Sequence, residues 1–119
     1  MGERKKIKVF VSGPYTKGDV AQNVKAAIHA ADMLTTCGYI PFVPHLTHFW
    51  HMIYPHSYEF WCEQDNEWLL VCNVVLRLPG ESAGSDAETK LAEEHGIPVY
   101  YDIDSILHDF GDFTSVRNI

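Results

Sequence analysis

Basic residues are scarce in this sequence. It contains nine Lys and Arg against sixteen Asp and Glu, which gives a formal net charge of −7. Only Arg4, Lys5, Lys6 and Lys8 lie together, close to the N-terminus. A protein that binds nucleic acid through its phosphates needs a broader basic face. The charge distribution therefore argues against nucleic-acid binding, and the N-terminal cluster is typical of a solubilised edge strand or a terminal tail.

Long apolar runs and paired cysteines are also missing. No apolar run approaches the roughly 20 residues of a membrane-spanning helix, and the charged N-terminus is unlike a secretory signal peptide. Cys37, Cys62 and Cys72 are odd in number and lack the CxxC spacing. Cys37 and Cys72 lie beside apolar segments, as the small buried hydrophobic residues of a reducing compartment do. We therefore expect a soluble, cytoplasmic protein that does not bind membranes.

What the sequence does contain is an alternation of strand and helix patterns. Its 119 residues, 46% of them hydrophobic and 21% charged, suit one globular domain. Strands are predicted at 7–12, 39–43, 72–78 and 97–101, and helices at 20–37, 57–70, 86–95 and 104–110. Pro41 favours a sheet edge for the second strand, and the nearly continuous apolar run of the third strand indicates a central position.

Strands that alternate with helices in this way form a doubly wound α/β fold. We predict a small, mostly parallel sheet of four to five strands with helices on both faces, similar to flavodoxin-like and Rossmann-like folds. The single domain covers 1–119, with 1–6 and 112–119 as flexible tails. Ligands bind such sheets outside the carboxyl ends of the strands. Three unusual segments fall at that rim: the turn at 12–16, a loop at 44–55 and the stretch at 78–89.

The stretch 78–89 leads from the third strand through Pro-Gly and a Gly/Ser loop into a helix. Backbone N–H groups and the positive end of the helix dipole favour an anion or an oxygen-rich ligand there. Ser82, Gly84 and Ser85 are candidates to hydrogen-bond phosphate or sugar oxygens. Alternatively, they form an ordinary turn in which Ser85 or Asp86 caps the helix.

Glu88 has two interpretations. As an acid near the helix start it complements the dipole. As a nucleophile it attacks an electrophilic carbon bound over the loop, as the carboxylate of a retaining glycosidase does. Glu81 and Asp86 compete for that role, but Glu81 is at the tip of the turn and Asp86 can cap the helix. We therefore favour Glu88.

Histidines recur at three-residue steps in the 44–55 loop, at His45, His48 and His51, with His56 just beyond. They are candidate metal ligands, although a zinc site usually adds a spaced carboxylate or cysteine. Aromatic residues between them suggest a simpler use, a wall for a flat ring. The aromatic candidates are Phe49, Trp50 and Tyr54. Asp65, on the second helix, is an exposed acid or a further ligand contact if the helix start faces the rim.

Three sequence features together resemble a known family. They are the run Val9-Phe-Val-Ser-Gly-Pro-Tyr15, the acid Asp65 ahead of an apolar strand, and Gly84-Ser-Asp-Ala-Glu88. In order and spacing, positions 7 to 101 resemble the nucleoside 2-deoxyribosyltransferases and their relatives, the deoxynucleoside 5′-monophosphate N-glycosidases. The resemblance implies cleavage of an N-glycosidic bond in a (deoxy)nucleoside or its 5′-monophosphate, or transfer of its base, without metal or cofactor. It also implies a homo-oligomer.

The resemblance assigns roles to several of the candidate residues, with Gly13, Pro14 and Tyr15 lining the sugar and base pocket. Glu88 is the nucleophile at the sugar C1′, and Asp65 holds or protonates the departing base. Relatives that act on 5′-monophosphates tend to have serine six residues before the nucleophile, as Ser82 is here, where the transferases have aspartate. A hydroxyl can donate to a phosphate that a carboxylate would repel, although Glu81 is adjacent, and Thr89 stands where the family often has glycine. The predicted substrate-binding residues are Ser12, Gly13, Pro14, Tyr15, His48, Trp50, Ser82, Gly84 and Ser85.

Other functions compete with this one. A binding or sensor module would keep the pocket without the chemistry. A phosphoribohydrolase of the cytokinin-activating type is a third possibility, because its Pro-Gly-Gly-x-Gly-Thr-x-x-Glu loop resembles 79–88, but the arginine motif that accompanies that loop is not found. Metal-dependent chemistry at the histidine loop ranks last.

Overall fold

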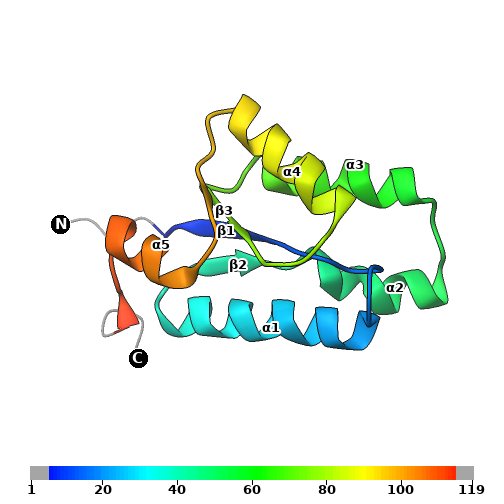
Figure 1. The fold of residues 1–119 in the computed structure, drawn as a ribbon, viewed down its shortest axis with the longest axis horizontal. Helices are drawn as coiled ribbons and strands as arrows, with labels where there is room; N and C mark the ends of the chain where they lie inside the picture. Colours follow the sequence, from blue (N-terminus) through cyan, green and yellow to red (C-terminus); the bar gives the residue numbers. More distant parts are fainter. Residues whose placement is uncertain (1–5, 115–119) are drawn as a thin grey trace.

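The computed structural model describes residues 6–114 as a four-stranded parallel sheet between two layers of helices (Figure 1). The strand order is β2-β1-β3-β4, and every pair is parallel. This confirms the predicted doubly wound, flavodoxin-like α/β fold, with four strands. In chain order the elements are β1 (Lys8–Ser12), α1 (Val20–Thr36), β2 (Ile40–Phe42), the 3₁₀ helix η1 (Pro44–Thr47), α2 (His48–Ile53), α3 (Tyr58–Leu69), β3 (Val74–Arg77), α4 (Ala83–Glu94), β4 (Val99–Tyr100) and α5 (Ile103–Phe110).

Alternation along the strands divides the core into two layers. Val9 and Val11 of β1 point to one face and Phe10 to the other, because successive side chains of a strand alternate. The first layer joins the sheet to α1 and α5, and the second joins it to α3 and α4 (Figure 1). The helical members are Ala27, Ala30, Ala31, Leu34 and Ile106 in the first layer, and Leu69 and Ala92 in the second.

The predicted strand positions are confirmed, with shorter strands than expected. β2, which contains Pro41, is an edge strand, and β3 is an interior strand. The fourth helix differs at its start, since α4 begins at Ala83 rather than near Asp86. The cause is Ser82, whose hydroxyl oxygen accepts the backbone N–H of Ser85 at 3.0 Å and caps the helix three residues early.

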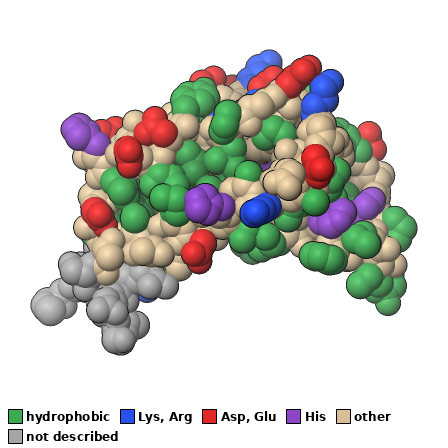
Figure 2. All heavy atoms as spheres, turned by 60° about the horizontal axis from the view of Figure 1, so that its bottom comes forward, with side chains coloured by type: hydrophobic (Ala, Val, Ile, Leu, Met, Phe, Trp, Pro, Cys, Tyr) green, Lys and Arg blue, Asp and Glu red, His purple; other side chains and the backbone are tan. Residues whose placement is uncertain are grey.

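The segment 44–55 is not the loop that the sequence predicts. It forms η1, which has proline at its first position, and then the short helix α2. Its pattern is hard to recognise because α2 has no buried residue, so its apolar side chains follow no core-facing stripe. Figure 2 shows hydrophobic side chains and histidines gathered at this end of the molecule. The exposed apolar residues there are Leu46, Phe49, Trp50, Met52, Ile53 and Tyr54.

The chain after α5 returns to cover the C-terminal end of α1. Phe113 packs against the first core layer and donates its backbone N–H to the Cys37 carbonyl at 3.0 Å. Of the predicted flexible tails, residues 1–5 and 115–119 lie outside the described residues, and Phe113 belongs to the packed core. Within 6–114, no helix is long and apolar enough to span a membrane.

Gly38 should be much less tolerant of substitution than Gly18, although both have positive φ, at +92° and +85°. A Cβ at Gly38 would lie 2.6 Å from the Phe113 Cβ, whereas one at Gly18 would meet nothing within 4 Å. We expect Gly18→Ala to lower the free energy of unfolding by about 1 kcal/mol, the cost of a left-handed residue. Gly38→Ala should lower the free energy of unfolding by about 1–3 kcal/mol more than Gly18→Ala does, because of overpacking. Urea denaturation measures both, and equal losses would contradict the role of Phe113.

Candidate active site

Two tight turns pack against each other at the carboxyl ends of β1 and β3. The Leu78 N–H donates to the Ser12 carbonyl at 2.7 Å, which continues the β1–β3 ladder past its last pair. A Cβ at Gly13 would lie 3.0 Å from the Leu78 Cβ, and one at Gly80 would lie 2.7 Å from the Pro14 ring. Glycine at both positions therefore lets the turns approach closely. The strand order reverses at this point, between β1 and β3, where doubly wound sheets bind ligands.

Ser12 and Glu88 meet beside these turns. Ser12 is two residues after Phe10, so its side chain points to the face that α3 and α4 cover. Ser12 is 1% exposed, and its hydroxyl donates to Glu88 Oε1 at 2.6 Å. Glu88 is on the second turn of α4, on the side of the helix that faces the sheet. A buried hydroxyl thus orients the carboxylate that the sequence predicts to be the nucleophile.

A second carboxyl, that of Asp65 on α3, lies in the same cavity as Glu88. Burial raises the pKa of Asp65 to about 6. Burial also raises the pKa of Glu88 to about 7, and the negative charge of Asp65 raises it further, against the opposing effects of the Ser12 hydrogen bond and the Arg77 charge. Two such carboxyls titrate as a pair, which between these values holds one proton. The site can therefore present a carboxylate and a carboxylic acid together near neutral pH.

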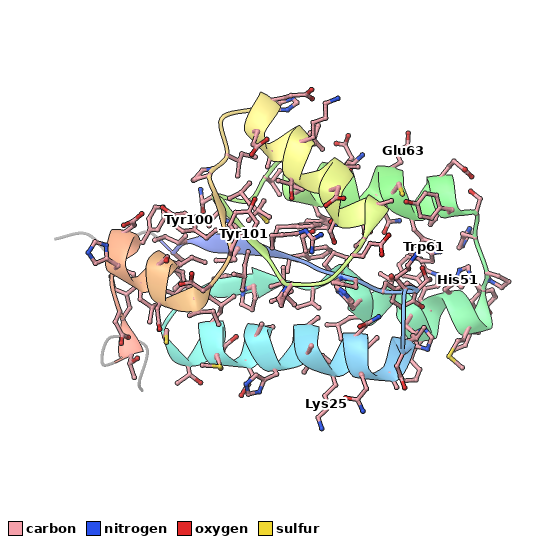
Figure 3. All side chains as sticks on the ribbon, in the orientation of Figure 1. Lys25, His51, Trp61, Glu63, Tyr100 and Tyr101 are labelled. Atoms are coloured by element: carbon pink, nitrogen blue, oxygen red, sulfur yellow. The ribbon has the colours of Figure 1, made fainter. Side chains whose placement is uncertain are left out.

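The cavity has a volume of about 500 Å³ and lies between the two turns, η1, α2 and α3. One wall is a stripe of α3, made of Tyr58, Trp61, Cys62 and Asp65. These positions are i, i+3, i+4 and i+7, so they lie on one helix face. Figure 3 shows Trp61 and His51 facing each other across α3 and α2, with Glu63 on the outside of α3. The volume and the aromatic wall suit a small flat ligand.

The histidines of 45–56 make separate contacts. His45 is buried, and burial lowers its pKa. Its Nε2–H donates to the Pro14 carbonyl at 3.0 Å, while its buried Nδ1 has no partner among the described residues. His48 bonds the Tyr15 hydroxyl through Nδ1, and His51 bonds Trp61. In residues 6–114, no group of three or more His, Cys, Asp or Glu is arranged to hold a metal ion.

The start of α4 forms another part of the cavity wall. Ser82, Gly84 and Ser85 line it, and the partial positive charge of the helix N-terminus lies there. Lys17, from the first turn, faces Glu81 across the mouth at 3.6 Å. Both side chains are largely exposed, so this ion pair adds little stability but offsets the Glu81 charge.

The structure brings most of the predicted site residues together. Gly13, Tyr15, Asp65 and Glu88 line the cavity with the three residues at the start of α4, and Ser12 bonds Glu88 from behind. Pro14, His48 and Trp50 do not line it: Pro14 and His48 support cavity residues, and Trp50 packs against Trp61 and His56. Phe49 and Tyr54 are also exposed and outside it. Their roles in binding stay predictions.

Sequence reasoning expected an aromatic wall from the 44–55 segment and missed the aromatic residues of α3. Tyr58, Trp61 and Cys62 line the cavity, and the signal was present as their helical spacing with Asp65. Trp61 is apolar, so the sequence pattern alone does not distinguish it from a core residue of α3. Leu69, at the C-terminal end of α3, packs in the second core layer and decides which side of α3 faces the sheet.

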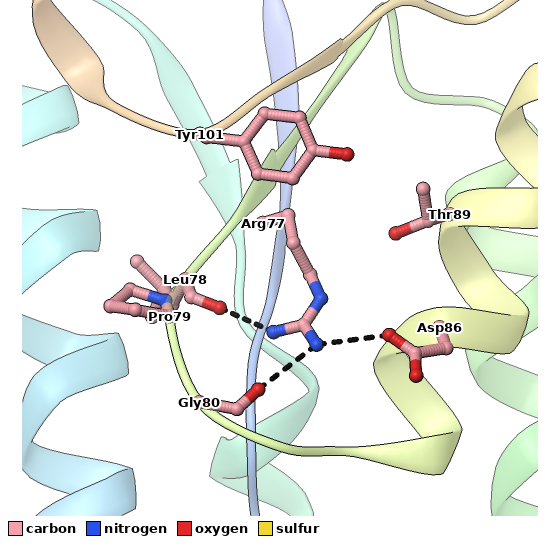
Figure 4. A pocket seen from close by; sticks show the side chains of 7 residues that line it. All are labelled: Arg77, Leu78, Pro79, Gly80, Asp86, Thr89 and Tyr101. Atoms are coloured by element: carbon pink, nitrogen blue, oxygen red, sulfur yellow. Dashed lines mark hydrogen bonds and ion pairs between the residues drawn. The ribbon is translucent and has the colours of Figure 1, made fainter.

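A smaller cavity of about 330 Å³ lies on the other side of the β3–α4 loop (Figure 4). Arg77 occupies its centre and bonds the Leu78 carbonyl, the Gly80 carbonyl at 3.0 Å and Asp86 Oδ1 at 3.1 Å. The guanidinium therefore ties the loop to the first turn of α4. We interpret this cavity as the support of the loop and not as a second binding site.

A family model described as Domain of unknown function (DUF7768) matches residues 7–102. The chain belongs to this family. No curated protein matches the sequence of this chain. Its structure is similar to that of a 2-deoxyribosyltransferase from the psychrotolerant bacterium Bacillus psychrosaccharolyticus, with a TM-score of 0.57 and 20% identity over 94% of this chain and 91% of that chain. At this identity the likeness shows a shared fold, which confirms the expected resemblance at the level of the fold.

Removing the Glu88 charge should stabilise the protein at high pH. A carboxyl whose pKa rises from 4.5 to about 7 on folding holds its proton more tightly in the folded state, so folding stability falls as pH rises through that window. We expect Glu88→Gln to be as stable as the parent at pH 4 and more stable by up to roughly 3 kcal/mol at pH 8. Denaturant unfolding across pH measures this.

Glu63→Gln is the matched control, because Glu63 is exposed on the outside of α3 and its substitution changes no buried charge. If the difference in the free energy of unfolding between Glu88→Gln and the parent stays constant from pH 4 to pH 8, Glu88 is not the buried acid described above.

Proposed function

We propose that this protein cleaves the N-glycosidic bond of a (deoxy)nucleoside or its 5′-monophosphate, or transfers the base, through a covalent glycosyl intermediate on Glu88. One observation carries the proposal: a carboxylate oriented by a buried serine shares a cavity of about 500 Å³ with a second carboxyl, Asp65. Paired carboxyl groups are the usual machinery for glycosidic bond cleavage. The similarity to a 2-deoxyribosyltransferase structure supports a cavity of the right kind but not the reaction itself.

The reaction divides between the two carboxyl groups. A Glu88 oxygen attacks the sugar C1′ while the bond from C1′ to the base nitrogen breaks and its electron pair leaves with the base. Asp65 donates its proton to the base. Asp65 then takes a proton from a water molecule, or from a second base, whose oxygen or nitrogen attacks C1′ from the vacated side. The ester to Glu88 breaks, and the product retains the configuration at C1′.

The raised pKa values keep one proton on the two carboxyl groups near neutral pH. The pair holds one proton between pH values of about 6 and 7, and the higher pKa of Glu88 places that proton mainly on Glu88. The reactive form, with Glu88 ionised and Asp65 protonated, is therefore the less populated of the two one-proton forms. The Ser12 hydroxyl favours the ionised form of Glu88 because it can donate to a carboxylate. Below this window no nucleophile is present, and above it no proton donor is present.

A 5′-monophosphate fits the start of α4. The Ser82 oxygen accepts the Ser85 N–H, which leaves the hydroxyl hydrogen to donate to a phosphate oxygen. The helix N-terminus favours an anion, and Lys17 lies across the mouth of the cavity. The homo-oligomer that the family resemblance implies stays a prediction.

The decisive measurement is release of free base from a panel of deoxynucleosides, ribonucleosides and their 5′-monophosphates, followed by chromatography. We expect at least one substrate to be cleaved and Glu88→Ala to reduce its kcat/KM by about a thousandfold or more. Asp65→Asn should lose roughly 10²- to 10⁴-fold, as for removal of a general acid.

Glu63→Gln is the control for both variants and should retain full activity. Base release that survives Glu88→Ala would refute the nucleophile. Binding of a nucleotide without release from any member of the panel would instead support the binding module.

Ser82→Asp should shift selectivity from nucleotide to nucleoside. Aspartate caps a helix as well as serine does, so the fold is kept while a negative charge is placed where a phosphate would bind. We expect the ratio of kcat/KM for a 5′-monophosphate to that for its nucleoside to fall by about tenfold or more. Glu81→Gln should raise the same ratio slightly, because Glu81 is exposed and paired with Lys17. An unchanged ratio in Ser82→Asp would place the phosphate elsewhere.

A further inference from the structure

His51 of α2 lines the cavity beside α3 and has its hydrogen-bonding pattern set by two neighbours. Its Nδ1 accepts the indole N–H of Trp61 at 2.8 Å and the backbone N–H of His56 at 3.2 Å. Figure 3 shows His51 and Trp61 directed toward each other from adjacent helices. The ring is therefore held from two sides by groups that can only donate.

These donors decide where the ring hydrogen of His51 is. An indole N–H and a backbone N–H carry no lone pair to accept with, so Nδ1 must supply the lone pair to both. The hydrogen of the imidazole ring is then on Nε2. The other tautomer would set an Nδ1–H against two N–H groups, and it would lose both hydrogen bonds.

Aromatic packing keeps the pair in place. The rings of His51 and Trp61 meet edge to face with their centroids 5.9 Å apart, and those of Trp50 and Trp61 meet in the same way at 5.1 Å. His56 stacks on Phe60 at 4.1 Å, which holds the backbone that supplies the second N–H. Such contacts favour this arrangement of the rings beyond their burial alone.

Nε2–H of His51 makes no hydrogen bond to any of the residues 6–114 that the structure records. Nε2 can therefore only donate a hydrogen bond, and it belongs to a side chain that lines the cavity. His51 is joined to Trp61, which is one helical turn from Asp65 on the same face of α3. Under the proposed function, Asp65 meets the departing base, so His51 lies along the wall that the base occupies.

We propose that His51 selects the base: its Nε2–H donates to a carbonyl oxygen, so the cavity favours an oxo-substituted base over the amino analogue of the same ring. The inference rests on the proposed function. An exocyclic amino group would set one donor against another, and His51 cannot change tautomer without opposing two further donors. Trp61 is a positioning residue that holds His51 in this state.

The test uses Glu88→Gln, which cannot form the glycosyl intermediate, so that binding is measured without turnover. Isothermal titration calorimetry compares two matched pairs of 5′-monophosphates. The first pair is deoxyinosine and deoxyadenosine 5′-monophosphate, and the second is deoxyuridine and deoxycytidine 5′-monophosphate. In each pair that binds, we expect the oxo ligand to bind about tenfold or more tightly than the amino ligand. Adding His51→Gln should reduce the difference to about threefold or less, because a side-chain amide can turn to offer either its N–H or its oxygen.

Trp61→Phe and Trp68→Phe form a matched pair of controls. Trp61→Phe removes one donor to Nδ1 and should lower the discrimination partly, since the His56 N–H remains. Trp68 stacks on Phe42 away from the cavity, so Trp68→Phe should change nothing. ¹⁵N NMR of the imidazole reports the tautomer directly and should show the His51 hydrogen on Nε2.

Equal binding within both pairs, or a His51 hydrogen on Nδ1, overturns the inference while the proposed function stands. Failure of all four ligands to bind overturns the proposed function and this inference with it.

Discussion

The contact between the β1–α1 and β3–α4 turns is the constraint on which the rest of the site depends. Gly13 against Leu78, and Gly80 against Pro14, leave no room for a side chain between the turns. Because β1 and β3 are adjacent in the sheet, this contact holds the end of β1 beside the start of α4. Ser12 can then reach Glu88, which is 76 residues away along the chain. The arrangement therefore depends on the two central strands of the sheet and not on one loop.

Placing two carboxyl groups in one cavity has an energetic consequence. Burial disfavours the ionised form of each, and the pair disfavours double ionisation. The fold therefore loses stability at the pH at which the carboxylates ionise, as expected of a functional site and not of a structural ion pair. Arg77 offsets part of this cost, but its guanidinium is occupied with the loop carbonyls and Asp86, so it does not neutralise Glu88 by direct contact.

The histidines join the elements around the cavity. His45 ties η1 to the first turn, His48 ties α2 to Tyr15, and His51 ties α2 to α3. Because α2 buries none of its residues, these polar contacts do much of the positioning that a hydrophobic core does elsewhere. Polar contacts of this kind also set which ring nitrogen carries a hydrogen, and thereby which groups a cavity can recognise.

The sequence by itself determined the order of the strands and of the helices other than η1 and α2, and the rim on which the unusual segments meet. Strand periodicity, Pro41 at an edge and glycine after a helix act within a few residues, so they survive without knowledge of the fold. It also singled out Glu88 as the candidate nucleophile, because the strand, turn and helix pattern around Glu88 is local. The sequence did not determine the aromatic wall, since Trp61 is apolar and only the packing of Leu69 decides which face of α3 turns to the core. It did not determine which contacts the histidines make, because their partners Pro14, Tyr15 and Trp61 come from other elements. Only tertiary structure brings such groups within hydrogen-bonding distance, and hydrogen bonds depend on that distance steeply.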